Sequence, residues 1–105
     1  MRRLAVLLVA ITLVGCTGAE RTAEDTRAAA TQLVANVAAQ EYVGVTIGPI
    51  VTCAVDNASE AELESLVDMT LAEGMTGRVN QRILAMLRRS STQGCIRAAG
   101  IVLPR

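Results

Sequence analysis

The chain has 105 residues, in which ten arginines balance ten acidic residues, and it contains no histidine, lysine, phenylalanine or tryptophan. Without histidine or lysine it cannot supply an imidazole base, a histidine metal ligand or a Schiff-base amine. Tyr42 is its one aromatic residue, so stacking on nucleic-acid bases is excluded as a main binding mode. We therefore predict no enzymatic activity, no cofactor, no metal ion and no nucleic-acid partner.

The amino terminus has the pattern of a secretory signal peptide. Two arginines follow Met1, and the apolar run 4–14 comes next. About 20 apolar residues are needed to cross a bilayer, so eleven cannot span one. A basic start before a short apolar run is typical of an exported protein, and residues 1–15 are predicted to be removed.

The run ends in Leu13-Val14-Gly15-Cys16, which resembles the lipobox of bacterial lipoproteins. The resemblance implies cleavage before Cys16 and attachment of a diacylglycerol to its sulfur. Residues 16–21 would then be a lipidated tether, and Thr17 in place of aspartate implies the inner face of the outer membrane in a cell with two membranes. The alternative is an ordinary signal peptide cut after Ala19.

Two further cysteines, Cys53 and Cys95, would remain in the exported chain. Export brings both into an oxidising compartment, where disulfides persist. We predict that they pair within one chain, the alternatives being two buried free thiols or a bond between chains. The pair would close a loop of roughly 40 residues. It would stabilise a domain whose hydrophobic core is small because the chain is short.

The first predicted helix covers about 23–40. Thr22 can cap it, with acidic residues in the first turn. Its apolar stripe follows helical spacing and consists of Ala30, Leu33, Val34, Val37 and Ala38.

Segment 43–55 is ambiguous. Pro49 suits the first position of a helix over 49–56, whereas the β-branched residues of the segment suit strands. We favour the helix, and a two-strand hairpin of 43–47 with 50–55 is the alternative.

Three capped segments follow. Ser59 begins a capping box ahead of a helix to residue 73, whose apolar stripe runs from Leu63 to Leu71, and Gly74 ends it. Thr76 can cap a helix to residue 89, and Ser91 or Thr92 can cap a last short helix that carries Cys95. The predicted fold is all-α, a small four-helix domain over 22–105 with one disulfide and with 43–55 as its least certain part.

Charge is distributed unevenly along this domain. All ten acids lie between residues 20 and 73, and every later charge is an arginine. The basic part could form a surface for an anionic partner, with Arg78, Arg82, Arg88 and Arg89 as the candidate residues. We favour a different interpretation, in which the acidic helix 59–73 and the basic helix 78–89 pack as antiparallel neighbours and neutralise each other.

These features predict a lipid-anchored, periplasm-facing protein of the cell envelope that binds or supports an envelope protein without catalysis. In size, lipid and disulfide it is similar to the small helical lipoproteins that chaperone secretion-system subunits, the pilotins. The mature segment also resembles uncharacterised small lipoproteins of alphaproteobacteria. The alternatives are an interaction lipoprotein of lysis or conjugation, and a small exported enzyme.

Overall fold

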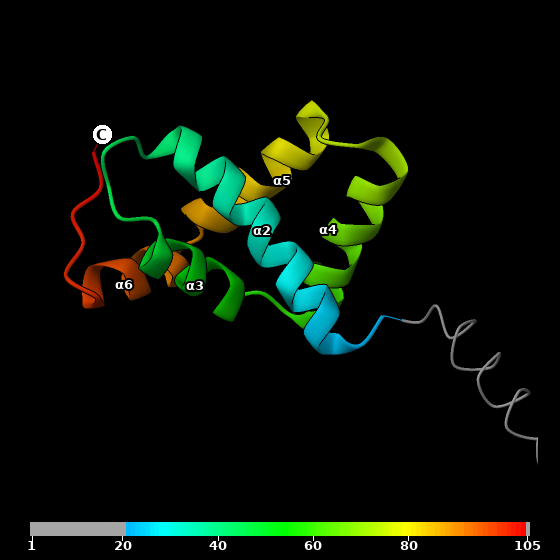
Figure 1. The fold of residues 1–105 in the computed structure, drawn as a ribbon. Coiled ribbons are helices and arrows are strands. Elements are labelled where there is room, and N and C mark those ends of the chain that lie inside the picture. Colours follow the sequence, from blue (N-terminus) through cyan, green and yellow to red (C-terminus); the bar gives the residue numbers. More distant parts are fainter. Residues whose placement is uncertain (1–20, 105) are drawn as a thin grey trace, which may run out of the picture.

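The computed structural model describes residues 21–104, and within that range the chain is all-helical, with five helices and no strand (Figure 1). The helices are α2 (Ala23–Glu41), α3 (Gly48–Asp56), α4 (Glu60–Glu73), α5 (Gly77–Arg88) and α6 (Ser90–Ala98). The prediction of four helices was wrong by one, because the ambiguous segment adds α3. The predicted signal peptide 1–15 and most of the tether 16–21 lie outside the described residues.

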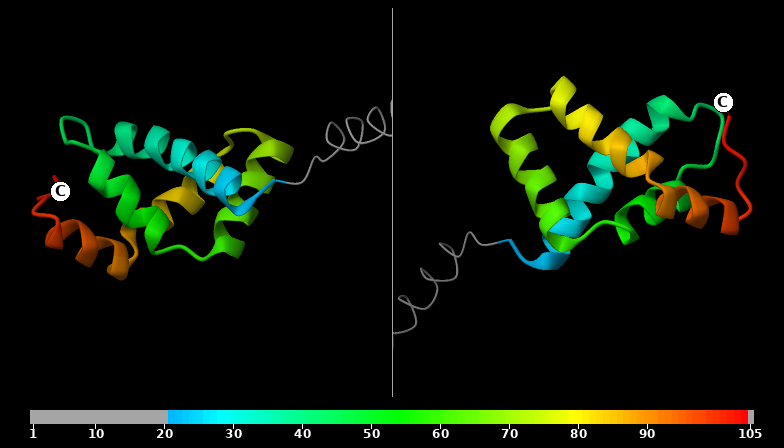
Figure 2. Two further views of the ribbon diagram at one scale, coloured as in Figure 1. Left: turned by 60° about the horizontal axis from the view of Figure 1, so that its bottom comes forward. Right: turned by 180° about the vertical axis from the view of Figure 1, so that it is seen from behind.

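Helix α2 is the element on which the others pack. It lies across the molecule and contacts α3, α4 and α5 (Figures 1 and 2). Its buried apolar residues are Ala30, Val34, Val37 and Ala38, as the sequence predicted, whereas Leu33 is only partly buried. Thr22 caps the helix in a full capping box with Asp25. The small side chains of this stripe let three helices approach closely.

Helix α3 shows that burial outweighs local propensity. Pro49 occupies its first turn, where a missing N–H costs no hydrogen bond. Ile50, Val51 and Val55 are β-branched, yet all three are buried in the common core. A helix places them on one side together with Cys53, and the two-strand hairpin was therefore a wrong alternative.

Helices α4 and α5 run in roughly opposite directions and are joined by residues 74–76 (Figure 2). Ser59 and Thr76 accept hydrogen bonds from backbone N–H groups at the starts of α4 and α5, as predicted. The other half of the predicted capping box at Ser59 does not form, because the Glu62 carboxylate binds Arg89 instead. Gly74 has a positive φ of 76°, a conformation that glycine adopts without strain. Each helix buries an apolar stripe in the core, but Leu71, predicted as part of the α4 stripe, is 74% exposed.

Helix α6 differs from its prediction at its start. It begins at Ser90 directly after Arg89, and no side chain caps it. Thr92, a predicted cap, is fully buried, and its hydroxyl finds no hydrogen-bond partner among residues 21–104. Beyond Gly100, Ile101 and Leu103 pack against the core, while Val102 is 90% exposed.

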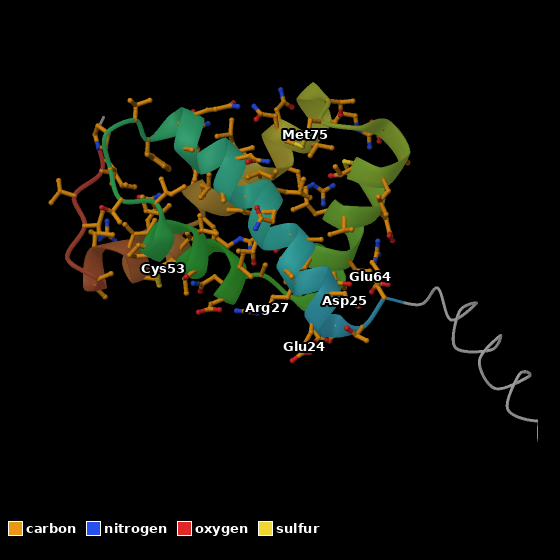
Figure 3. All side chains as sticks on the ribbon, viewed as in Figure 1. Glu24, Asp25, Arg27, Cys53, Glu64 and Met75 are labelled. Atoms are coloured by element: carbon orange, nitrogen blue, oxygen red, sulfur yellow. A yellow bond between two sulfur atoms is a disulfide. The ribbon has the colours of Figure 1, made fainter. Side chains whose placement is uncertain are left out.

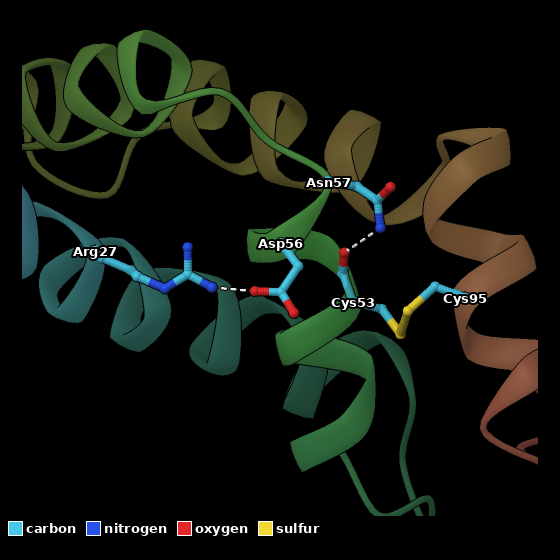
Figure 4. The surroundings of a disulfide bond; sticks show 5 residues. All are labelled: Arg27, Cys53, Asp56, Asn57 and Cys95. Carbon is cyan, nitrogen blue, oxygen red and sulfur yellow. Dashed lines mark hydrogen bonds and ion pairs between the residues drawn. A yellow bond between two sulfur atoms is a disulfide. The ribbon is translucent and has the colours of Figure 1, made fainter.

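The predicted disulfide between Cys53 and Cys95 is present, with a Cα–Cα distance of 5.7 Å (Figure 4). It joins α3 to α6 across 42 residues of sequence. Beside it, the side-chain amide of Asn57 donates to the carbonyl oxygen of Cys53 and closes the end of α3. The bond therefore fastens the last helix of the chain to the core.

Burial of the α4 stripe should dominate its contribution to stability. Leu66 is completely buried, so we expect Leu66→Ala to lower the free energy of unfolding by about 2–5 kcal/mol. Leu71→Ala makes the same chemical change on the same helix at an exposed site, where about 0.5 kcal/mol or less is expected. Urea unfolding monitored by circular dichroism measures both, and equal losses would contradict the packing described here.

Reduction of the Cys53–Cys95 bond should destabilise the domain. Opening a loop of this length removes a constraint on the unfolded chain worth about 4 kcal/mol in the chain-entropy model. We expect a correspondingly lower urea midpoint in reductant, and no such change in a Cys53→Ser, Cys95→Ser double variant. Rapid alkylation of both thiols in the unreduced, folded protein would show that the bond is absent.

Candidate functional site

The four candidate arginines do not act as one surface in the structure. Arg89 sits between α5 and α6 and faces inward. Its guanidinium donates to both carboxylate oxygens of Glu62, at 2.9 and 2.6 Å, and to the carbonyl oxygen of Asn57 at 2.9 Å. It therefore ties the start of α4 to the junction of α5 and α6.

The same contact shifts the ionisation of both partners. The hydrogen bond from Arg89 lowers the pKa of Glu62, against the opposing effect of partial burial. The hydrogen bond to Glu62 raises the pKa of Arg89 in turn. The two side chains are 20% and 35% exposed, so this pair is the best shielded of the ion pairs found in the described residues, and its role is structural.

Arg78 and Arg88 form weaker contacts. Arg78 lies 3.7 Å from Glu73, and Arg88 lies 3.2 Å from Glu41 at the end of α2. The arginine side chains are 72% and 63% exposed. Exposed pairs of this kind contribute about 0–1 kcal/mol, so both guanidinium groups can still engage a partner.

Arg82 is exposed on α5, and among residues 21–104 it has no carboxylate within 4.0 Å. Arg97 on α6 is in the same situation. The interpretation that the acidic and basic helices neutralise each other is therefore correct for Arg89 and Arg78, which pair with Glu62 and Glu73 of α4, and incomplete for Arg82 and Arg88. Arg78, Arg82 and Arg88 are the part of the predicted anionic-partner surface that solvent reaches.

A charged surface of mixed sign, the α4–α5 face, follows from this arrangement. We define it by Glu64 and Asp68 on α4 and by Arg78 and Arg82 on α5. Glu64, Asp68 and Arg78 line one open depression together with Ala61, Ser65, Met69 and Glu73. Acidic and basic rows thus lie side by side on the same side of the molecule.

A second hollow of about 160 Å³ lies where α2 and α4 begin. Arg21 and Arg27 line it from the α2 side, and Glu60 and Glu64 from the α4 side. Figure 3 shows Glu24, Asp25 and Glu64 gathered at this end, which is rich in acidic side chains, with Met75 at the other end of α4. Both arginines already form ion pairs, Arg21 with Asp68 and Arg27 with Asp56 (Figure 4).

These pairs escaped sequence reasoning, as did the contact of Arg88 with Glu41. The partners are separated by 47 residues for Arg21–Asp68 and Arg88–Glu41, and by 29 for Arg27–Asp56. No local spacing signals such contacts. One local pattern in the sequence does point to the hollow where α2 and α4 begin, since the caps at Thr22 and Ser59 are each followed by acidic residues.

Over residues 21–104 there is no group of three or more side chains able to hold a metal ion. No helix in that part of the chain is long and apolar enough to cross a membrane. Cys16, the predicted lipidation site, lies outside the described residues.

Comparison with known proteins places the chain in no family. No family model matches it, and neither a curated protein nor a solved structure is significantly similar to it.

Arg88 and Arg89 offer a matched pair of adjacent substitutions. We expect Arg89→Ala to cost about 1–3 kcal/mol of unfolding free energy, because it removes hydrogen bonds to a charged and partly buried group. Arg88→Ala should cost about 0–1 kcal/mol. Because folding lowers the pKa of Glu62, the pair stabilises fully above the ordinary pKa and loses its effect as pH falls through the lowered one. Unfolding free energies measured between pH 7 and pH 3 should therefore fall less steeply for Arg89→Ala than for Arg88→Ala.

Proposed function

We propose that this protein is a lipoprotein of the cell envelope whose helical domain binds or supports an envelope protein without catalysis. The acylated residue is Cys16, and the domain faces the periplasm. In a cell with two membranes, Thr17 after the cysteine favours the inner face of the outer membrane.

The Leu13-Val14-Gly15-Cys16 run carries this proposal. The Cys53–Cys95 disulfide supports it independently, because disulfides persist in exported proteins and are rare where thiols are kept reduced. Two or more acyl chains give stable anchoring, whereas one gives only marginal binding. The lipid is thus sufficient as a membrane anchor.

The start of the domain adds a geometric argument. Arg21 already belongs to the folded body, since it pairs with Asp68 on α4. Arg21 follows Cys16 by five steps along the chain, which at full extension span at most about 18 Å. A lipid on Cys16 would therefore hold the beginnings of α2 and α4 close to the membrane, with the α4–α5 turn at Met75 directed away from it.

The exposed groups favour binding as the role. Arg78, Arg82 and Arg88 project from a scaffold that a disulfide and Arg89 hold together. Preorganised charges of this kind attract and orient a partner of complementary charge. A protein in the envelope is the partner that we propose.

The lipidation step is directly testable. In the chain purified from envelopes, we expect an amino-terminal Cys16 peptide whose mass includes a diacylglycerol, and recovery of the protein in the membrane fraction. Cys16→Ser should leave an unprocessed or soluble protein, because the sulfur that carries the lipid is gone. Thr17→Ser is the matched neighbour and should leave acylation unchanged.

An unmodified terminus at Ala19 or Glu20 would contradict the proposal, since it indicates an ordinary signal peptide. Membrane recovery of Cys16→Ser at the level of the unaltered protein would contradict it as well.

A further inference from the structure

The charges of the α4–α5 face form two parallel rows. Glu64 and Asp68 lie one helical turn apart on α4, and Arg78 and Arg82 lie one turn apart on α5. Glu64, Asp68 and Arg78 line the same depression, so the rows point to the same side. Between them the exposed side chains are small, for example Ala61 and Ser65.

Two of these four charges are already paired within one copy, Asp68 with Arg21 and Arg78 with Glu73. Contacts at both ends of the helix pair, Arg78 with Glu73 and Arg89 with Glu62, set the register of α5 against α4. In this register Arg82 is level with Asp68 and one turn from Glu64. Among the described residues, neither Arg82 nor Glu64 has an oppositely charged group within 4.0 Å.

We propose that the α4–α5 face pairs with the same face of a second copy of this chain, about a two-fold axis that runs parallel to the two helices. Such an axis lies in the plane of contact, and rotation about it places α4 of one copy opposite α5 of the other. The acidic row of each copy then lies against the arginine row of the other. Arg82 of one copy comes within one turn, about 5.4 Å, of Glu64 of its partner, so its long side chain reaches that carboxylate, whereas Asp68 is already held by Arg21 of its own copy.

The charge pattern favours this axis over a two-fold axis that lies in the same plane but runs perpendicular to the helices. A two-fold axis perpendicular to the helices would bring acid against acid and arginine against arginine, which is destabilising. A self-complementary patch of this kind is what a two-fold contact requires, because the same surface is used by both copies.

The selected axis also keeps both amino-terminal ends of the domains on one side. Two copies anchored in one membrane leaflet could therefore pair without strain, and their confinement raises the effective concentration of each for the other. This membrane step rests on the proposed function, whereas the pairing of the faces does not.

Self-association of the full chain, purified in detergent, tests the pairing. Sedimentation measured over a range of concentrations should show a monomer–dimer equilibrium that weakens when salt is raised, because the contacts are exposed ion pairs. Arg82→Glu and Glu64→Arg should each weaken dimerisation by about tenfold, since symmetry makes every substitution count twice. The combined variant restores opposite charges across the contact and should return the dissociation constant to within about threefold of the original.

Arg97→Glu is the matched control, because it reverses an exposed arginine on α6, outside the α4–α5 face, and should leave dimerisation unchanged. A chain that is monomeric at low salt at all concentrations overturns the inference. So does a loss in Arg97→Glu equal to that in Arg82→Glu. The chain could also prove monomeric and retain an acidic envelope protein that the Arg82→Glu variant does not retain. That result would overturn the pairing and assign the α4–α5 face to the envelope protein. An unlipidated chain that still dimerises in this charge-dependent way would refute the proposed anchoring and leave the pairing intact.

Discussion

The packing of three helices against α2 is the constraint on which this structure depends. The buried stripe of α2 consists only of alanine, valine and threonine, so the helices on it come close together, and they supply the bulky groups of the core, such as Leu66, Ile83 and Met86. Apart from Tyr42 the chain has no aromatic side chain to fill larger gaps. An almost wholly aliphatic core must instead be packed closely, because each gap forfeits contacts that no aromatic side chain replaces.

Helix α6 depends on this core less directly. It contacts α3 and α5, and it lacks a side-chain cap at its start. The disulfide to α3 compensates for this, and Arg89 fixes the junction from which α6 departs by binding Glu62 and the carbonyl of Asn57. The disulfide and the charge-assisted contact of Arg89 thus hold α6 against the rest of the domain at two separate points.

Position divides the arginines into two roles. Arg89 is held by three hydrogen bonds to groups that folding brings around it, and the energy of that contact supports the fold. Arg78 and Arg82 lie on the open side of α5, where water screens them and where their charge is available for recognition. Neighbouring arginines of one basic segment thus serve opposite purposes, which a count of charges along the chain conceals.

The sequence by itself determined most of the helices, since their caps and their 3.6-residue stripes are local patterns. Thr22, Ser59 and Thr76 cap the helices that they were expected to cap, and the pairing of Cys53 with Cys95 followed from cysteine number and context. Pro49 favoured a helix over 49–56 in the sequence, but only the tertiary structure decided it against the two-strand hairpin, because burial against α2 outweighs the strand preference of the β-branched residues. It also decided that Thr92 is buried and Leu71 exposed, and which arginine faces inward. Those outcomes depend on where distant segments meet, and the spacing of residues along one helix carries no information about its neighbours.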